Sequence, residues 1–272
     1  MKVQENQIGS ESLLDAGAVL EKLRRSNLYK QFHWLESVPS TQAVAKQMGE
    51  ENAPHGTLVW AEYQTEGRGR RGRVWEAAKC ENLIFSLLLR SSFRAEDLFW
   101  VTACLGLAVC YALETVSGLA GMIKWPNDIF LEGKKVGGIL TEARFDGSLT
   151  RYIVSGLGLN VNWNPQKDKE MPYPVTSVSR EVRECIKRED LLGEILQGFE
   201  RQFSFLECGK RRPIEEAWLS RFILLGKRVL VIGDGVEFEC TVTGLRKDGA
   251  LLIQRSNGTE EPVFAGDVSL RM

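Results

Sequence analysis

The sequence predicts an α+β protein: a mixed β-sheet with flanking helices, followed by a small domain of short strands. Two observations predict the first part. Strongly apolar runs of strand length recur between residues 31 and 162, and longer segments carry apolar side chains at helical spacing. The third observation is a change, after Leu225-Gly226, to short alternating segments separated by Gly-containing turns. We therefore expect a helical extension over residues 1–30, a main domain over 31–224 and a C-terminal domain over 225–272.

The first elements are a short helix, a strand and a second helix. Ser12-Leu13-Leu14-Asp15 offers a capping-box start for the helix of the extension. Phe32 and Trp34 then alternate with polar neighbours as a strand does, up to Val38-Pro39. Ser40-Thr41-Gln42 opens the next helix, where a Ser-Thr pair could serve simply as an N-cap.

An apolar strand at Thr57–Tyr63 leads through Gln64 into the segment Gly67–Arg73, which contains four arginines and three glycines. Glycine lets a backbone come close to a ligand, and arginine supplies forked donors suited to phosphate or carboxylate. The segment is predicted to be a loop that closes over an anion. A solvated basic turn and a nucleic-acid-binding arm are the alternatives that the loop alone leaves open.

Three further strands and a helix complete the predicted core. Asn82–Arg90 is strongly apolar, and Leu98–Val116 has the spacing of a helix face. Val136–Leu140 and Tyr152–Asn162 are predicted to be neighbouring strands. Glycines within them, such as Gly156, either make room for a ligand or form bulges. They do not open a helix as a G-x-G-x-x-G motif does, so a dinucleotide-binding fold is rejected.

The remainder is predicted as a polar loop, two helices and a set of short strands. Pro165–Ser179 is polar and contains proline, and Glu189–Cys208 is amphipathic. A short helix is expected over Pro213–Phe222. The strands expected after it are Lys227–Ile232, Val236–Leu245, Ala250–Gln254 and Pro262–Phe264.

Composition limits the possible functions. The formal net charge of −1 argues against a non-specific nucleic-acid binder, which should be basic over a whole face. The six cysteines show no C-x-x-C spacing and are expected to be reduced, and two histidines give little basis for a zinc site. No apolar run long enough to span a membrane is evident, and no secretory signal. We therefore expect a cytoplasmic protein without its own metal site, whose metal arrives with a nucleotide.

Three segments together carry a family resemblance: the Arg-Gly loop, Lys124–Asp128 with Gly133–Glu142, and Gly156–Asn162. With Ser40-Thr41 and Gln64 upstream, their order and spacing resemble a biotin protein ligase (biotin–[acetyl-CoA-carboxylase] ligase), from about Trp34 onward. The resemblance implies a class II synthetase-like catalytic domain and an SH3-like C-terminal domain. Some members of the family carry an N-terminal winged helix-turn-helix and act as repressors. The chain resembles the forms without this module, because the residues before Phe32 leave no room for it.

The resemblance also implies the residues of the site. Lys124 and Arg70 are implied as catalytic. The residues implied to bind biotin are Ser40, Thr41, Gln42, Gln64, Arg68, Gly69, Arg70, Lys124, Gly156 and Gly158. The residues implied to bind the nucleotide are Arg70, Arg71, Arg73, Trp75, Asn127 and Asn160. Gln42 stands where the family more often has Asn, which puts its contact with biotin in doubt, and Arg71 and Arg73 could equally be solvated.

The implied chemistry has two half-reactions. ATP with Mg²⁺ activates biotin as biotinyl-5'-AMP, and a lysine of a biotin carboxyl carrier protein domain then attacks this adenylate. Asp128 is a conceivable base for that lysine. A lipoate or octanoate ligase or transferase is the alternative of the same class, and a biotin-sensing DNA-binding repressor is the alternative of a different class. We expect no specific DNA binding and no membrane partner, and a homodimer is possible.

Overall fold

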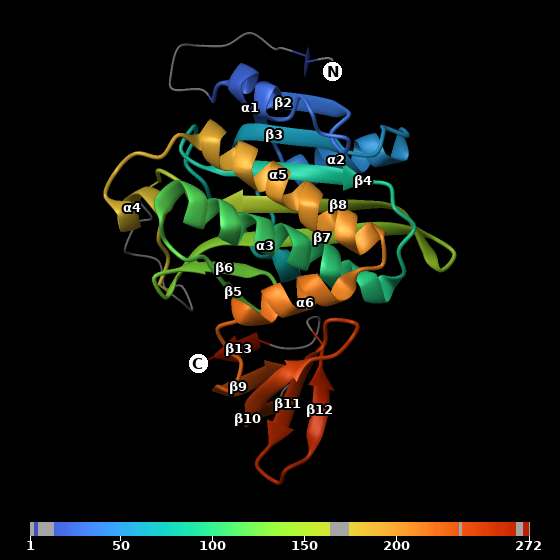
Figure 1. The fold of residues 1–272 in the computed structure, drawn as a ribbon, viewed down its shortest axis with the longest axis vertical. Helices are drawn as coiled ribbons and strands as arrows, with labels where there is room; N and C mark the ends of the chain where they lie inside the picture. Colours follow the sequence, from blue (N-terminus) through green and yellow to red (C-terminus); the bar gives the residue numbers. More distant parts are fainter. Residues whose placement is uncertain (1–2, 5–13, 164–173, 234–235, 265–268, 272) are drawn as a thin grey trace.

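The computed structural model describes residues 3–4, 14–163, 174–233, 236–264 and 269–271. They form an eight-stranded mixed sheet with helices on both faces and a separate five-stranded antiparallel sheet (Figure 1). The predicted α+β class, with a mixed sheet first and a small β domain last, is confirmed.

The large sheet has the strand order β1-β2-β3-β4-β8-β7-β6-β5. The pairs β1–β2 and β2–β3 are parallel and the other pairs are antiparallel. Strand β8 therefore lies between β4 and β7, although β4 precedes it by a long stretch of chain. The strands are β1 (Val3–Gln4), β2 (Gln31–Val38), β3 (Thr57–Gln64), β4 (Leu83–Leu89), β5 (Met122–Lys124), β6 (Asp128–Leu131), β7 (Lys134–Asp146) and β8 (Leu149–Leu159).

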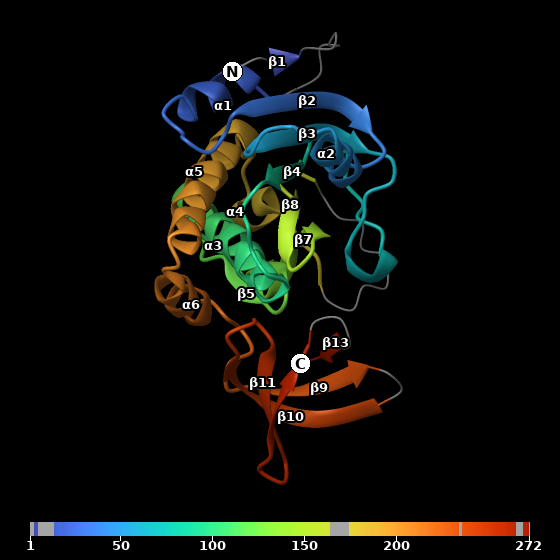
Figure 2. The same ribbon diagram turned by 90° about the vertical axis from the view of Figure 1, so that its right-hand side faces the viewer.

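Alternation along the strands gives the large sheet two different faces. On β4, Phe85 and Leu87 join the main core, whereas Leu88 joins a smaller core with Ala45 of α2. Helices α3 and α5 cover the first face and α2 the second, as Figure 2 shows. We call these the α3 face and the α2 face. The helices are α1 (Ala16–Lys22), α2 (Thr41–Glu50), α3 (Leu98–Ser117), α4 (Val178–Val182), α5 (Arg188–Glu207) and α6 (Arg211–Ser220).

Helix α3 corrects one expectation. Of the helices in the described ranges, the segment Ala95–Ser117 is the one that is long and apolar enough to cross a membrane, a feature that our sequence analysis missed. Most of its side chains are buried. They pack against the sheet and against α5, where Gly198 lies so close that a Cβ would be 3.3 Å from Ala108 Cα. Burial on several sides explains why this helix is apolar nearly all round.

The small sheet has the strand order β12-β11-β10-β9-β13. It lies below α6 in Figure 1, and its residues join the same hydrophobic core as the main domain. Its strands are β9 (Arg228–Gly233), β10 (Val236–Leu245), β11 (Leu251–Arg255), β12 (Glu260–Val263) and β13 (Ser269–Arg271).

Other sequence expectations differ from the structure in detail. Helix α1 is capped by Asp15, whose carboxylate accepts from the Ala18 N–H, and Ser12 lies outside the described residues. Most of the loop expected over Pro165–Ser179 also lies outside them, and its end begins α4. The bulges considered at the glycines of β8 are absent, because the β7–β8 register shifts only between Arg144 and Phe145.

Candidate active site

The floor of the candidate site is a patch of bare backbone on the α2 face. Gly138 of β7 lies opposite Gly158 of β8, and Gly156 lies on the same face of β8. A Cβ on Gly156 would lie 2.6 Å from Oε1 of Gln42, and a Cβ on Gly158 would lie 2.3 Å from Cε2 of Trp75. Glycine is therefore required at Gly158 by the indole ring that rests on the sheet, whereas at Gly156 a side chain would displace the end of Gln42.

A row of opposed residues places Lys124 on this same face. Lys124 of β5 pairs with Asp128 of β6, Asp128 pairs with Gly138, and Gly138 pairs with Gly158. Residues directly opposite one another on neighbouring strands present their side chains to one face of the sheet. The row thus brings Lys124 to the face that carries the glycine floor and the indole of Trp75.

Lys124 is a buried cation, with 2% of its surface exposed. Burial lowers the pKa of Lys124 to about 8, against the opposing effect of Asp128 and with the support of Lys135 and Arg73. Asp128 itself is paired with Lys135, with 2.6 Å between Oδ1 and Nζ. Lys124 is therefore largely protonated at neutral pH and can offer a positive charge to an anion on the sheet.

Thr41, Gln64 and Ser86 form a bonded polar group beside the floor. The amide N–H and the hydroxyl of Thr41 both donate to Oε1 of Gln64, at 2.7 and 3.0 Å. The hydroxyls of Thr41 and Ser86 lie 2.9 Å apart. Ser40 is buried beside them as the N-cap residue of α2, but its side chain makes no capping hydrogen bond. Simple capping therefore does not account for this hydroxyl.

The amide of Gln42 is occupied by the protein itself. Its Nε2 donates to Oε2 of Glu142 at 3.0 Å and to the carbonyl of Val154 at 3.1 Å. Its Oε1 accepts from the hydroxyl of Ser86 at 3.1 Å, and Lys46 pairs with the other oxygen of Glu142 at 2.6 Å. The Nε2 group is therefore fully used within the protein, whereas Oε1 keeps a second lone pair that a ligand donor could use.

The Arg-Gly loop is closed by its own backbone. The Gly69 N–H donates to the carbonyl of Arg73 at 2.7 Å, and the Trp75 N–H donates to the carbonyl of Gly67 at 2.9 Å. Arg70–Gly72 forms a tight turn at the tip, with Arg71 in the left-handed conformation. A Cβ on Gly67 would lie 2.2 Å from the Trp75 carbonyl oxygen, so the first glycine of the loop permits this closure.

Arg70 connects this loop to the other half of the site. Its NH1 donates to Oδ1 of Asn127 at 3.3 Å, which joins the loop to the segment that follows Lys124. Burial and the neighbouring Arg71 lower the pKa of Arg70, while Asp128 raises it. The side chains of the other loop arginines are exposed: Arg68, Arg71 and Arg73.

Trp75 and Asn160 each keep a buried polar atom without a partner within the described residues. The indole of Trp75 rests on Gly158, with Nζ of Lys135 6.0 Å from its ring centroid, and its Nε1 is the unpartnered atom. Asn160 follows β8; its Nδ2 donates to the carbonyl of Thr176 at 3.0 Å, and its Oδ1 has no partner. Buried polar atoms of this kind are candidates for ligand contacts.

Three residues of the site were not predicted from the sequence. Ser86 is the only polar residue in the strand Leu-Ile-Phe-Ser-Leu-Leu-Leu, and this interruption was a usable signal. Lys135 and Glu142 lie in a motif that we quoted, but their partners, Asp128 and Gln42, could not be read from spacing.

The described residues were also considered as ligands for a metal ion. Within the described ranges, no cluster of three or more His, Cys, Asp or Glu side chains could hold an ion. Mg²⁺ commonly keeps several waters and uses one or two carboxylates together with substrate phosphates. Asp128 is the carboxylate of the row and would be the residue to contact a magnesium ion that arrives with a nucleotide.

Comparison with known proteins agrees with this geometry. Residues 34–160 match the Biotin/lipoate A/B protein ligase family, and residues 224–271 match the Biotin protein ligase C terminal domain. A "Biotin--[acetyl-CoA-carboxylase] ligase" of Paracoccus denitrificans is 32% identical over 209 residues, which cover 74% of this chain and 85% of that protein. The chain belongs to the biotin protein ligase family.

Other biotin protein ligases extend the similarity over nearly the whole chain. A "Bifunctional ligase/repressor BirA" of Bacillus subtilis is 31% identical over 262 residues, which cover 96% of this chain and 79% of that protein. The biotin protein ligase of Aquifex aeolicus in complex with biotin and ATP superposes with a TM-score of 0.75 at 29% identity, covering 89% of this chain and 99% of that one. The biotin protein ligase of Leishmania major in complex with biotinyl-5-AMP superposes with a TM-score of 0.58 at 28% identity. The match covers 86% of this chain and 99% of that one.

Proposed function

We propose that this enzyme activates biotin with ATP as biotinyl-5'-AMP, releases pyrophosphate, and transfers biotin to a lysine of a carrier domain of a biotin-dependent carboxylase. The observation that carries the proposal is the row across the sheet. It puts the buried cation of Lys124 on the same face as the glycine floor, while Arg70 bonds to Asn127 at one end of the row. One cation on the floor and another on the loop that faces it suit a reaction between two anions.

In the first half-reaction, a carboxylate oxygen of biotin forms a bond to the α-phosphorus of ATP, and the bond to pyrophosphate breaks. Both partners are negative, so their approach requires positive charge already in place. Lys124 supplies it from beneath, and Arg70 from the loop above. Mg²⁺ bound to the triphosphate would neutralise further charge. The position of Lys124 on an ordered strand limits the reorganisation needed when the ligands enter.

The remaining assignments divide the site into a biotin end near Gly156 and a nucleotide end near Gly158. The buried hydroxyls of Ser40 and Thr41, with Gln64, are proposed to bond the ureido ring of biotin above Gly156. Arg68 and Gly69 are proposed to line the biotin and phosphate region. Trp75, Asn127 and Asn160 are proposed to contact the nucleotide, and the free Oδ1 of Asn160 can accept from an amino group of adenine. Arg71 and Arg73, both exposed, are proposed to lie on the phosphate side of the nucleotide.

In the second half-reaction, the amine of the acceptor lysine attacks the acyl carbon and AMP leaves. The amine must lose a proton, since its unperturbed pKa is about 10.4. Asp128 is poorly suited to accept that proton, because its Oδ1 is already 2.6 Å from the ammonium of Lys135. We therefore do not assign Asp128 as the base.

The direct test is mass spectrometry of a purified biotin carboxyl carrier domain after incubation with the enzyme and ATP. We expect a biotinyl adduct on one lysine with biotin, and no adduct when lipoate or octanoate replaces biotin. Omission of ATP is the matched control and should abolish the adduct. A lipoyl or octanoyl adduct of similar yield would instead favour the lipoate ligase alternative.

The family contains proteins named both ligase and repressor, so whether this chain binds DNA is a separate question. A repressor needs a basic reading surface, whereas this chain has a formal net charge of −1. We infer a cytoplasmic ligase that does not bind DNA specifically, which can be checked by gel shift with its own promoter DNA at physiological salt.

The buried state of Lys124 predicts a pH dependence for adenylate formation. Below a pH of about 8 the ammonium of Lys124 is protonated and can face the anions, and above it the charge is lost. We expect kcat/KM for pyrophosphate release, which reports the free enzyme, to be level at lower pH and to fall as the pH rises above about 8. Lys124→Arg keeps its charge at every pH tested, so this variant should lack the alkaline fall. A wild-type profile that stays level well above that pH would exclude Lys124 as the titrating group.

A further inference from the structure

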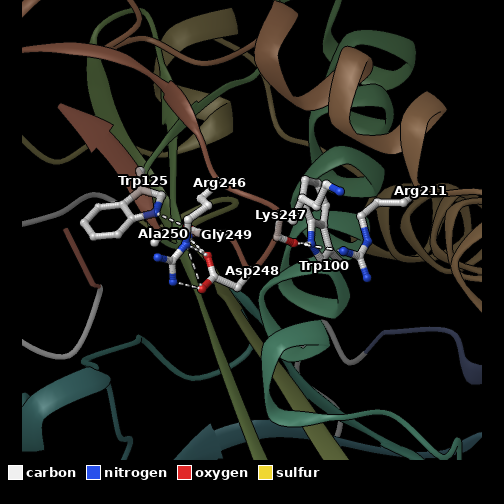
Figure 3. A network of polar contacts seen from close by, with 8 residues as sticks. All are labelled: Trp100, Trp125, Arg211, Arg246, Lys247, Asp248, Gly249 and Ala250. Carbon is white, nitrogen blue, oxygen red and sulfur yellow. Dashed lines mark hydrogen bonds and ion pairs between the residues drawn. The ribbon is translucent and has the colours of Figure 1, made fainter. Parts of the chain in front are cut away.

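The turn between β10 and β11 projects from the small sheet into the main domain (Figure 3). The Arg246 N–H donates to the carbonyl of Ala250, and the Gly249 N–H donates to the carbonyl of Arg246, both at 2.8 Å. Asp248 accepts from Nε of Arg246 at 2.9 Å and from the Ala250 N–H at 3.2 Å. These internal bonds fix the backbone of the turn. They therefore also fix the orientation of the carbonyls of Lys247 and Gly249, which make no bond within the turn.

Two of those carbonyls accept hydrogen bonds from indoles of the main domain. The carbonyl of Lys247 accepts from Nε1 of Trp100 at 2.7 Å and from NH1 of Arg211 at 2.9 Å. The carbonyl of Gly249 accepts from Nε1 of Trp125 at 2.9 Å. The two indole rings are buried, at 0% and 2% exposure, so water cannot replace a lost partner there without cost.

Glycine is required at position 249 for this approach. Its φ is +80°, a conformation that side chains disfavour, and a Cβ there would lie 2.0 Å from Cγ of Phe99. The turn therefore rests directly on the first turn of α3, and the carbonyl of Gly249 meets Trp125 from that position.

Trp125 is the residue that follows Lys124, and the two side chains lie on opposite faces of the large sheet. Trp125 belongs to the main hydrophobic core, whereas the row that contains Lys124 lies on the α2 face. Strand β5 has only three residues and forms the edge of the large sheet. Lys124 is its last residue and pairs with Asp128 across a short turn, whose residue Asn127 is bonded to Ile139 by its carbonyl and its side-chain amide. Between these two bonded residues, Trp125 is packed in the core and its indole N–H is fixed by the carbonyl of Gly249.

We propose that the β10–β11 turn positions Lys124 for adenylate formation through the hydrogen bond between Trp125 and Gly249. Trp125 is then a positioning residue, and the small sheet takes part in the first half-reaction without touching either substrate. The inference rests on the proposed function, since it assigns how the charge of Lys124 is held on the floor of that site.

The test compares Trp125→Phe with wild type in single-turnover pyrophosphate release from biotin and ATP. The phenyl ring retains most of the packing but cannot donate to Gly249. We expect the rate to fall about tenfold, because the free energy that one buried hydrogen bond contributes corresponds to roughly a factor of ten in rate. If Trp125 acts through Lys124, the same change made in a Lys124→Ala background should lower the residual rate by less than about twofold. A purely structural role would give the same factor in both backgrounds.

Trp100→Phe is the matched control, because it removes the other indole bond to the same turn at a position not adjacent to Lys124. We expect a similar change in Tm and a rate within about twofold of wild type. Equal rate losses in the two Trp variants, or a wild-type rate for Trp125→Phe, would overturn the inference and leave the proposed function intact. If Trp125→Phe does not fold, Asp248→Ala, which removes the carboxylate that fixes the turn and adds no atom, applies the same double-background test from the side of the turn. Wild-type enzyme that releases no pyrophosphate would refute both proposals.

Discussion

Lys124→Ala is expected to lower the rate of pyrophosphate release by about two orders of magnitude, because one preorganised electrostatic contact in such a site contributes ~3 kcal/mol to transition-state stabilisation. The variant keeps the glycine floor and the polar group at Thr41, but it leaves the anions to meet without the cation beneath them. The measurement is the rate of pyrophosphate release from biotin and ATP, with thermal melting run in parallel. Burial already disfavours the charged form of Lys124, so Tm is expected to stay near the wild-type value.

A matched control for this experiment is Lys22→Ala. It removes a lysine of α1 that is ion-paired with Asp190 at 2.7 Å, far along the chain from the site. Its rate of pyrophosphate release should equal that of wild type. Near-wild-type release from Lys124→Ala would show that Lys124 is not the activating cation, whatever its burial.

Arg70→Gly is expected to separate formation of the adenylate from its retention. The guanidinium links the tip of the Arg-Gly loop to Asn127 across the site, and glycine both removes this link and loosens the loop. Loss of a charge-assisted contact of ~1.5–3 kcal/mol should speed escape of biotinyl-5'-AMP roughly ten- to a hundredfold. The free adenylate would then react with lysines in solution. Biotin incorporated into serum albumin, compared with biotin on the carrier domain, measures the escape.

Arg71→Gly provides the comparison within the same loop. Arg71 is exposed and already has a φ of 57°, which glycine adopts readily, so this variant changes the same chemistry without breaking the link to Asn127. It should raise albumin labelling much less than Arg70→Gly does. If Arg70→Gly is instead simply inactive, Arg70 serves formation of the adenylate more than its retention, and the division of labour with Lys124 is wrong.

The strands and long helices of the main domain were predictable from the sequence, because each is a local apolar pattern. The runs at Thr57–Tyr63 and Asn82–Arg90 became β3 and β4, and the run from Leu98 became α3. The short β6 was not predicted, since four residues after a turn carry little periodicity. The order of the sheet was not predictable either, because it depends on which distant strands pair and not on any local pattern.

The site shows the same limit. Motifs indicated Lys124, Arg70 and the glycines, but not the contacts that give them their properties. The low pKa of Lys124 comes mainly from burial by the folded sheet, and the need for glycine at Gly158 comes from the ring of Trp75. Ser86 became a site residue only because β4 pairs with β8 and faces α2.

The position of β8 between β4 and β7 has a consequence for synthesis of the chain on the ribosome. The strands that present Gln64 and Ser86 emerge early, and Lys124 and Gly138 emerge later, but the two groups share no sheet until β8 is inserted between them. Such non-local pairing comes late in folding, after the chain segments it joins have been made. A nascent or prematurely terminated chain that stops before β8 therefore lacks Gly156 and Gly158 and has no complete floor. Under the proposed function, such unfinished chains cannot release a reactive anhydride into the cell.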